Sequence, residues 1–386
     1  MKKGVMIKKD DWKYFLSEDV NNAFNMVTGY NIMWGKTKEE TPKYSPYGPF
    51  IMDLEVSTVC SGTDHGPCKH CYKSNTPKGK NMSFETFKEI FNKMPKTLTQ
   101  IAFGIGDLDA NKDLIKMFEY CRNNEHNPNV IPNITINGYG LTNEWINILA
   151  KYCGGVAVSL YHDKDVCYNA IERLSKAGLK QCNIHQVIAI ETIEKCHELI
   201  EDAANDSRLI DHLKSIMFLT LKPKGKRNRM NIVKDVNKYK GLIDHAMDNR
   251  IQIGFDSCSA PIFLQAMKYD KNFNKYVQMV ESCESGLFSS YINVDGIYWH
   301  CSFTEDQPGW KGVNVLDKKD FMEVWNDPET IRFRKKLIEQ DNSHICNDCR
   351  LCPVYDLYHE DIGNASNTIY QPIFELKAEH RLEMKT

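Results

Sequence analysis

Short apolar runs of strand length alternate with longer segments of helical periodicity between residues 51 and 256. The strand-like runs are predicted at 51–57, 98–104, 131–136, 155–160, 181–190 and 215–221. A helix is expected after each run, and the first begins at Ser83 and places Phe84, Phe87 and Ile90 on one face. Strands alternating with helices of this length predict parallel βαβ units, and therefore a twisted sheet or a barrel. Chemistry in such folds lies at the carboxyl ends of the strands.

The pattern changes after residue 256, where the alternation stops. Two alternating runs, at 288–294 and 297–303, meet at Asp295-Gly296 and predict a β-hairpin. A helix is expected near 318–340.

The start of the chain is polar and weakly periodic. Trp12, Tyr14 and Phe15 are expected to anchor a short helix there. The length of the chain favours one large and one smaller domain. We therefore expect an N-terminal extension at 1–50, a main domain at 51–256, a second domain at 257–355 and a charged tail at 356–386.

Composition narrows the class of protein. The chain has 386 residues, a formal net charge of −2 and 42% hydrophobic residues, which is typical of a soluble globular protein without a bias toward nucleic acid. Its apolar runs are too short to span a membrane, and its basic start lacks the apolar region of a signal peptide. We therefore expect a cytoplasmic protein with neither membrane nor nucleic-acid partners.

Cysteine usage changes the picture more than charge does. Of 14 cysteines, six lie in two tight clusters, a pattern that in a cytosolic chain favours metal sites over disulfides. Five others are expected to be ordinary core residues on apolar faces: Cys121, Cys153, Cys167, Cys182 and Cys196.

The first cluster is Cys60-x7-Cys68-x2-Cys71, on a glycine- and proline-rich loop directly after the first predicted strand. A structural zinc normally takes four protein ligands, whereas a [4Fe–4S] cluster held by three cysteines leaves one iron open. Three thiols on one loop therefore favour an open iron–sulfur site. The alternative is a zinc knuckle that borrows His65 or His70.

This arrangement resembles the radical S-adenosylmethionine (radical SAM) enzymes, in which a cysteine triad follows the first strand of a βα barrel. The ending Cys68-x2-Cys71-Tyr72 agrees with that family, but the usual first gap is three residues and here it is seven. The resemblance implies an α/β fold, a partial (βα)6 barrel with a small C-terminal α+β domain for an auxiliary cluster. Uncharacterised radical SAM proteins of bacteriophage type are similar.

The same resemblance points to residues that would bind S-adenosylmethionine. Phe103-Gly-Ile-Gly-Asp107 stands where the family has a Gly-Gly-Glu-like motif for the methionine amino group, and Asn137 ends the third strand as in its Thr-Asn-Gly motif. Small residues allow close backbone approach, and a carboxylate suits an ammonium. The implied cofactor-binding residues are Tyr72, Gly104, Gly106, Asp107, Asn137, Ser159 and His185, with Gln186 beside the last. For each of them singly, turn chemistry or core packing is the alternative.

A second cysteine group resembles the SPASM and Twitch extensions of radical SAM enzymes. Cys283-x12-Gly296-x4-Cys301 places one thiol before the predicted hairpin and one at its end, and Cys346-x2-Cys349-x2-Cys352 follows the helix. A full SPASM domain has seven cysteines for two clusters. We therefore expect one auxiliary cluster, which the resemblance implies is of the [4Fe–4S] type, held by Cys283, Cys301 and two of Cys346, Cys349 and Cys352. A zinc ribbon is the alternative.

Two further features remain open at this point. Cys258 ends the last barrel-like strand and fits three roles: an auxiliary ligand, a catalytic hydrogen donor to a substrate radical, or a small residue in a turn. The segment 222–229 holds five cations, a composition typical of a solvated loop, although its position also suits the binding of an anionic substrate.

The resemblance implies an oxidoreductase- or maturase-type enzyme that cleaves S-adenosylmethionine to a 5′-deoxyadenosyl radical, which abstracts hydrogen from a substrate. A one-electron reductant such as flavodoxin or ferredoxin is implied. The expected substrate is a peptide or protein side chain, and the alternative is a small anionic or nucleotide-like molecule. A non-enzymatic electron carrier or zinc-binding module is disfavoured, because it needs neither the open triad nor the Gly-Ile-Gly-Asp segment.

Overall fold

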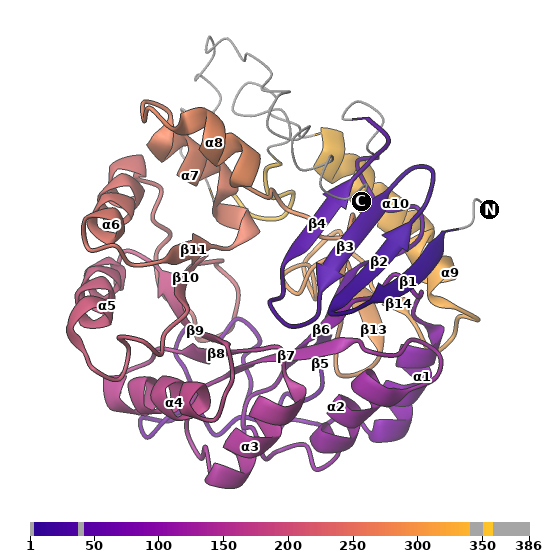
Figure 1. The fold of residues 1–386 in the computed structure, drawn as a ribbon, viewed down its shortest axis with the longest axis horizontal. Coiled ribbons are helices and arrows are strands. Elements are labelled where there is room, and N and C mark those ends of the chain that lie inside the picture. Colours follow the sequence, from indigo (N-terminus) through magenta and orange to yellow (C-terminus); the bar gives the residue numbers. More distant parts are fainter. Residues whose placement is uncertain (1–3, 38–41, 340–349, 358–386) are drawn as a thin grey trace.

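A ten-stranded, mostly parallel sheet forms the centre of the computed structural model, which describes residues 4–37, 42–339 and 350–357 (Figure 1). Its order is β11-β10-β9-β8-β7-β6-β5-β12-β13-β14. The parallel strands that follow one another in the chain are β5 (Ile51–Glu55), β6 (Gln100–Gly104), β7 (Ile131–Ile136), β8 (Gly155–Ser159), β9 (Gln181–Ile188), β10 (Ser215–Thr220) and β11 (Ile253–Phe255). The predicted α/β fold is confirmed, with β11 added to the six predicted strands.

Helices cover the outer face of this curved sheet (Figure 1). They are α1 (Phe84–Lys93), α2 (Leu114–Asn123), α3 (Asn143–Tyr152), α4 (Lys164–Lys176), α5 (Ile193–Asn205) and α6 (Val236–Asp248). Ser83 caps α1 as expected, because its Oγ accepts a hydrogen bond from the Thr86 N–H at 3.1 Å. Among the described residues, no helix has the length and apolar character that a membrane span requires.

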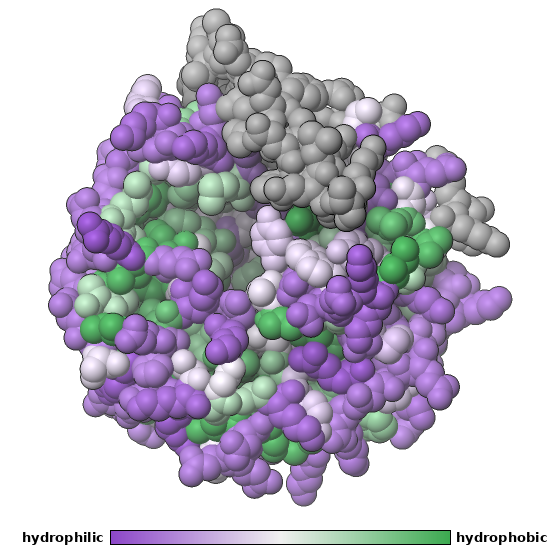
Figure 2. Space-filling view, in the orientation of Figure 1, coloured by the Kyte–Doolittle hydropathy of each residue, from purple (hydrophilic) through white to green (hydrophobic). Residues whose placement is uncertain are grey.

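Each strand presents two different faces, as its two-residue period requires. In β9 the side chains of Cys182, Ile184 and Ile188 are buried, whereas those of Asn183 and His185 are only partly so. The buried face packs against the helices, and the core between strands and helices contains all five cysteines that were expected to be core residues: Cys121, Cys153, Cys167, Cys182 and Cys196. The other face lines an interior that we call the lumen, and Figure 2 shows the molecule hollowed inside the ring of helices.

The C-terminal region continues the same sheet past residue 257. It contains a short 3-10 turn, η1 (Ser257–Ser259), then α7 (Ala260–Met267), α8 (Phe273–Met279), β12 (Ser289–Ile292), β13 (Ile297–Trp299), β14 (Val313–Asn314), α9 (Phe321–Trp325) and α10 (Pro328–Glu339). The predicted hairpin is confirmed as the antiparallel pair β12–β13, with Gly296 at a positive φ of 76° in its turn. Strand β12 also pairs in parallel with β5.

The helix expected near 318–340 is two helices. Pro328 opens α10, and its fixed φ and missing N–H suit a first helical position but not a helix interior. Asp327 caps the new helix, because its Oδ1 accepts from the Glu329 N–H at 3.0 Å.

Residues near the N-terminus form a four-stranded antiparallel sheet, so the expected short helix is wrong. Its strands are β1 (Val5–Lys9), β2 (Trp12–Leu16), β3 (Asn21–Asn25) and β4 (Asn31–Trp34). Lys13 and Phe15 are buried and alternate with partly exposed neighbours, which is a strand period. The Lys13 ammonium donates to Leu98 O at 2.9 Å, just before β6 begins. The small sheet therefore covers the amino ends of the barrel strands (Figure 1).

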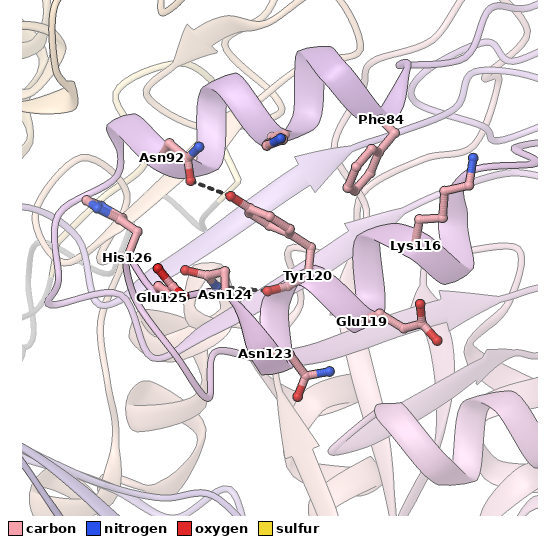
Figure 3. Close-up of a pocket in the computed structure, with 10 residues that line it drawn as sticks. Phe84, Asn92, Lys116, Glu119, Tyr120, Asn123, Asn124, Glu125 and His126 are labelled. Carbon is pink, nitrogen blue, oxygen red and sulfur yellow. Dashed lines mark hydrogen bonds between the residues drawn. The ribbon is translucent and has the colours of Figure 1, made fainter.

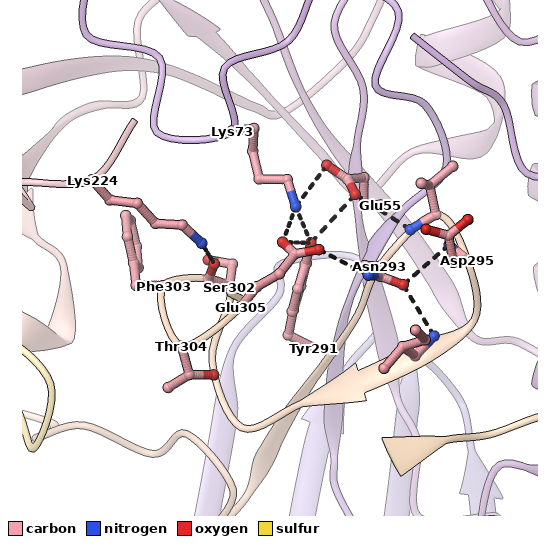
Figure 4. Close-up of polar contacts among 12 residues, drawn as sticks. Glu55, Lys73, Lys224, Tyr291, Asn293, Asp295, Ser302, Phe303, Thr304 and Glu305 are labelled. Carbon is pink, nitrogen blue, oxygen red and sulfur yellow. Dashed lines mark hydrogen bonds and ion pairs between the residues drawn. The ribbon is translucent and has the colours of Figure 1, made fainter. Parts of the chain in front are cut away.

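A buried ion cluster joins the barrel to the C-terminal hairpin (Figure 4). The Lys73 ammonium lies 3.1 Å from Glu55 Oε1, donates to the Tyr291 hydroxyl at 2.8 Å, and is ion-paired with Glu305. Asn293 donates to the second oxygen of Glu305 at 2.8 Å. Each of the three charged side chains is at most 10% exposed. The cluster thus ties the loop after β5 to β12 and to the segment after β13.

The pKa values of Glu55 and Glu305 shift in opposite directions, although both carboxylates contact the ammonium of Lys73. Burial raises the pKa of Glu55, only partly offset by Lys73. Burial also opposes the ionisation of Glu305, but the ammonium of Lys73 and the amide of Asn293 outweigh it and lower the pKa of that carboxyl. Removing the ammonium would leave two buried carboxylates facing each other.

Lys73→Met is expected to lower the free energy of unfolding by about 3–5 kcal/mol, because it leaves buried charge without a partner. The measurement is urea unfolding followed by circular dichroism. Lys80→Met is the matched control, since Lys80 pairs with Asp295 of the same hairpin while 60% exposed. The control is expected to change stability by less than about 1 kcal/mol. If the two substitutions lowered the free energy of unfolding equally, the buried cluster would contribute no more to stability than the exposed ion pair.

Candidate active site

The first cysteine loop leaves the carboxyl end of β5, as predicted for a barrel site. Cys60, Cys68 and Cys71 are all partly buried and lie close enough that charge on one thiol affects another. Burial is the main reason that the pKa values of Cys60 and Cys68 rise to about 11. The free thiols of Cys60 and Cys68 therefore stay protonated at neutral pH, and a cluster that binds them displaces their protons.

The seven-residue gap between Cys60 and Cys68 is shortened by a tight turn. Thr63 and Gly66 exchange backbone hydrogen bonds of 3.0 and 2.8 Å. Gly62, at a φ of +90°, approaches so closely that a Cβ there would lie 2.6 Å from the Cα of Pro67. Residues 63–66 therefore project as a separate turn, and the chain passes from Gly62 to Pro67 as if they were neighbours. Without the turn, the gap would be the three residues usual in the family that this loop resembles.

The Gly-Ile-Gly-Asp segment packs directly on this loop. A Cβ on Gly106 would lie 2.3 Å from Val59 O and 2.4 Å from the Cβ of Cys60, so only glycine fits. Asp107 accepts a hydrogen bond from the Ser61 N–H at 2.7 Å through one carboxylate oxygen. Gly104 ends β6 without comparable crowding, since its nearest neighbour would be 3.4 Å away.

The remaining predicted ligand-binding residues lie on neighbouring strands or at their ends. Asn137 follows β7, where its side-chain oxygen accepts from the Tyr139 N–H at 3.0 Å, the turn chemistry named above as the alternative. Ser159 of β8 and His185 of β9 stand opposite each other in register and face the lumen. Burial lowers the pKa of His185 to about 4, so its imidazole is neutral at physiological pH.

The histidines near the loop behave differently. A ring nitrogen of His70 lies 3.3 Å from Cys68 Sγ. The ring of His65 instead packs edge-on against His162, with the ring centroids 5.3 Å apart. Within the described residues, no three Cys, His, Asp or Glu side chains converge tightly enough to hold a single ion. A tetrahedral zinc needs its sulfur ligands about 2.3 Å from one point, whereas the cysteines of a cubane cluster bind different irons.

A second group of four thiols lines one enclosed cavity: Cys258, Cys283, Cys301 and Cys352. They come from η1, from the loops before and after the hairpin, and from the segment 350–357. Burial raises the pKa of Cys301 to about 12, and charge on Cys283 and Cys352 adds to this shift. Of the three roles left open for Cys258, its location favours the one beside the other auxiliary cysteines. Cys346 and Cys349 lie outside the described residues.

The basic segment 222–229 is not simply a solvated loop. Arg227 donates to Asn75 O at 2.9 Å, and a Cβ on Gly225 would lie 2.3 Å from Cys71 O, so the segment closes over the first cysteine loop. Lys222 is ion-paired with Asp256 and lines the cavity of the second cysteine group. Lys224 donates to Ser302 O at 2.8 Å (Figure 4).

One aromatic contact joins the surroundings of the two cysteine groups. The rings of Tyr72 and Phe303 have centroids 4.6 Å apart. Tyr72 directly follows Cys71, and Phe303 lies two residues after Cys301. This ring contact therefore joins the chain directly after the first cysteine group to the chain just after Cys301.

A wide surface groove lies elsewhere. It measures about 880 Å³ and runs between α1 and α2, with Phe84, Lys88, Asn92, Tyr120 and His126 among its lining residues (Figure 3). It opens on the helix side of the sheet and contains none of the predicted site residues. We assign it no part in the chemistry.

Sequence reasoning missed the side chains that support the cysteines. Tyr161 lies beside the first group, since charge on Cys68, Cys71 and Cys60 adds to the effect of burial in raising its pKa. Lys222 lies beside the second group and lines the same cavity as its four cysteines. The sequence does contain a signal for polar groups inside the barrel at β5, where Asp53 and Glu55 alternate with the buried apolar residues Met52 and Leu54.

Comparison with known proteins agrees with this geometry. The family model of the radical SAM superfamily matches residues 54–203, and the model of the SPASM iron–sulfur cluster-binding domain matches residues 283–353. No curated protein matches the sequence.

Solved structures show the same fold at low identity. SuiB of Streptococcus suis bound to its precursor peptide SuiA is 14% identical, with a TM-score of 0.67 over 90% of this chain and 95% of that one. SuiB bound to S-adenosylmethionine is also 14% identical, with a TM-score of 0.60 over 80% of this chain and 72% of that one. The enzyme anSMEcpe with bound AdoMet and the Cp18Cys peptide is 15% identical, with a TM-score of 0.55 over 80% and 91%.

The two matched regions contain the two cysteine groups. The first spans the triad loop and the strands around the lumen, and the second spans Cys283, Cys301 and Cys352. A [4Fe–4S] cluster, S-adenosylmethionine and auxiliary iron–sulfur binding follow from these domains. The chain therefore contains a radical SAM domain followed by a C-terminal SPASM domain.

Proposed function

We propose that this protein modifies a side chain of a peptide or protein by radical SAM chemistry. The observation that carries the proposal is that the Tyr72–Phe303 contact joins the triad loop, at the carboxyl end of β5, to the region of the four-thiol group. The structures of SuiB with its precursor peptide and of anSMEcpe with a peptide support the substrate class.

In this proposal Cys60, Cys68 and Cys71 hold the catalytic [4Fe–4S] cluster. When bound and reduced, the cluster supplies the electron that cleaves S-adenosylmethionine, and the resulting radical removes hydrogen from the substrate. Asp107 keeps one carboxylate oxygen for the methionine ammonium, because the other is held by the Ser61 N–H.

The second group is proposed to hold one auxiliary cluster, through Cys258, Cys283, Cys301 and Cys352. The ammonium of Lys222 lies beside these thiols and offsets part of their negative charge. An auxiliary cluster at this place would accept an electron, relay one or position the substrate.

A small anionic substrate is the second candidate, since it would use the basic segment 222–229. Lys222, Lys224 and Arg227 are already bonded to Asp256, to Ser302 O and to carbonyls of the cysteine loop. These contacts favour a structural role for the segment, and therefore the peptide hypothesis.

Anaerobically reconstituted protein is expected to hold about eight irons, and to release 5′-deoxyadenosine from S-adenosylmethionine on reduction with dithionite. Cys68→Ala is expected to abolish the release, because it removes a ligand of the catalytic cluster. Cys121→Ala is the matched control, since Cys121 is fully buried in the apolar core. Bound zinc without iron in the wild-type protein would overturn the proposal.

Cys258→Ala separates the roles considered for that residue. As a ligand, it is expected to lower the iron content from about eight to about four while the release of 5′-deoxyadenosine persists. Iron analysis and the electron paramagnetic resonance spectrum of the reduced protein are the measurements. Full iron content with an unchanged spectrum would exclude ligation.

The substrate class is tested by incubating the reconstituted protein and S-adenosylmethionine with the short peptide encoded nearest to its gene. Mass spectrometry is expected to show a mass change confined to one side chain. A peptide that stays unaltered while a cell extract yields a modified small molecule would favour the second candidate.

A further inference from the structure

One carboxylate inside the lumen has no assigned role. Asp53 lies in the middle of β5, between Met52 and Leu54, which are 0% and 1% exposed against the helices. Its side chain points to the opposite face, into the lumen, where its surface is accessible although the surrounding protein makes ionisation costly. The residues beside it in the sheet are Ala102 of β6 and Tyr291 of β12.

The carboxylate of Asp53 has no partner among the described residues. None of their hydrogen bonds or ion pairs involves its side chain. The surrounding protein raises its pKa to about 6 through burial alone, without an opposing contribution from a nearby cation. It therefore differs from Glu55, two residues further along the same face, which is bound by Lys73.

The cations nearest to this part of the lumen are already engaged. Lys73 lies 5.3 Å from the centre of the Tyr291 ring, and its ammonium is shared between Glu55 and Glu305. Lys224 donates to Ser302 O. Neither of these two described cations is left for Asp53, so its carboxylate is open to a cationic ligand.

We propose that Asp53 binds a cationic group of the substrate, a lysine or arginine side chain, within the lumen. A ligand that fills the lumen displaces the water around this carboxylate, which is costly unless the ligand supplies a donor or a positive charge. The adjacent ring of Tyr291 presents a further attractive surface to a cation. Ala102 on the other side leaves space. The inference rests on the proposed function, because it names the chemistry of that substrate.

S-adenosylmethionine also carries positive charge, so the source of the cation must be decided. The Gly-Ile-Gly-Asp segment lies beyond the end of β6, against the cysteine loop, and offers Asp107 to the methionine ammonium. Asp53 is deeper in the barrel and next to the C-terminal hairpin instead. This separation assigns Asp53 to the substrate.

The test compares wild-type protein, Asp53→Asn and Asp109→Asn, each reconstituted and loaded with S-adenosylmethionine. Asp109 is an exposed acid outside the lumen and serves as the matched control. The probe is n-butylammonium, which reproduces the end of a lysine side chain, with n-butanol as its neutral counterpart. Binding is measured by saturation-transfer NMR.

Wild-type protein and Asp109→Asn are expected to bind n-butylammonium, and Asp53→Asn to bind it about tenfold more weakly or worse. Binding of n-butanol should be weak and equal in all three. Equal binding of n-butylammonium by wild-type protein and Asp53→Asn would overturn the inference. Circular dichroism and iron content, unchanged in Asp53→Asn, exclude loss of folding as the cause.

Measuring the release of 5′-deoxyadenosine as a second readout distinguishes a failure of this inference from a failure of the proposed function. Asp53→Asn is expected to bind and cleave S-adenosylmethionine within about twofold of the wild-type protein, since the charge serves the substrate. A tenfold loss of S-adenosylmethionine binding with unchanged n-butylammonium binding would overturn the inference. A wild-type protein that cleaves no S-adenosylmethionine would overturn the proposed function, whereas its binding of n-butylammonium is measured independently.

Discussion

The buried ammonium of Lys73 is the constraint on which the arrangement of the site depends. It lies between two carboxylates from parts of the chain far apart in sequence, Glu55 of the first barrel strand and Glu305 after the hairpin. A buried ion cluster adds little net stability, but it strongly penalises any arrangement that separates its charges. Backbone pairing between β5 and β12 fixes the same two regions. The two cysteine groups are therefore held at a set separation before any cofactor binds.

The two faces of the barrel strands have different tasks. The outer face is an apolar core, whose packing with the helices stabilises the fold. The inner face carries groups that cost stability, including the neutral His185 and the unpaired Asp53. Polar side chains persist inside a protein at such a cost mainly where they bind something. Because side chains alternate along each of the seven parallel strands, the same strands provide apolar residues to the core on one face and polar residues to the lumen on the other.

The sequence predicted what depends on local periodicity and missed what depends on distant contacts. Barrel strands, the cap at Ser83 and the hairpin turn at Gly296 all follow from short-range patterns. The N-terminal strands were missed because the aromatic residues near Trp12 were read with a helical period, although Lys13 and Phe15 alternate as in a strand. No local pattern links Lys73 with Tyr291 and Glu305, which are 218 and 232 residues away. Cys258 likewise joins its group only through the fold.

The turn at residues 63–66 separates two quantities that are often treated as one, the number of residues between ligands and the distance between them. Its ends meet at Gly62 and Pro67, so its length can change without moving Cys60 relative to Cys68. A search that requires a fixed cysteine spacing would overlook chains of this kind. The turn also gives the protein an exposed appendage beside its reactive centre, with Asp64 and His65 at its tip, whose composition can diverge freely. The residues of this turn can therefore change while the geometry of the ligands stays constant.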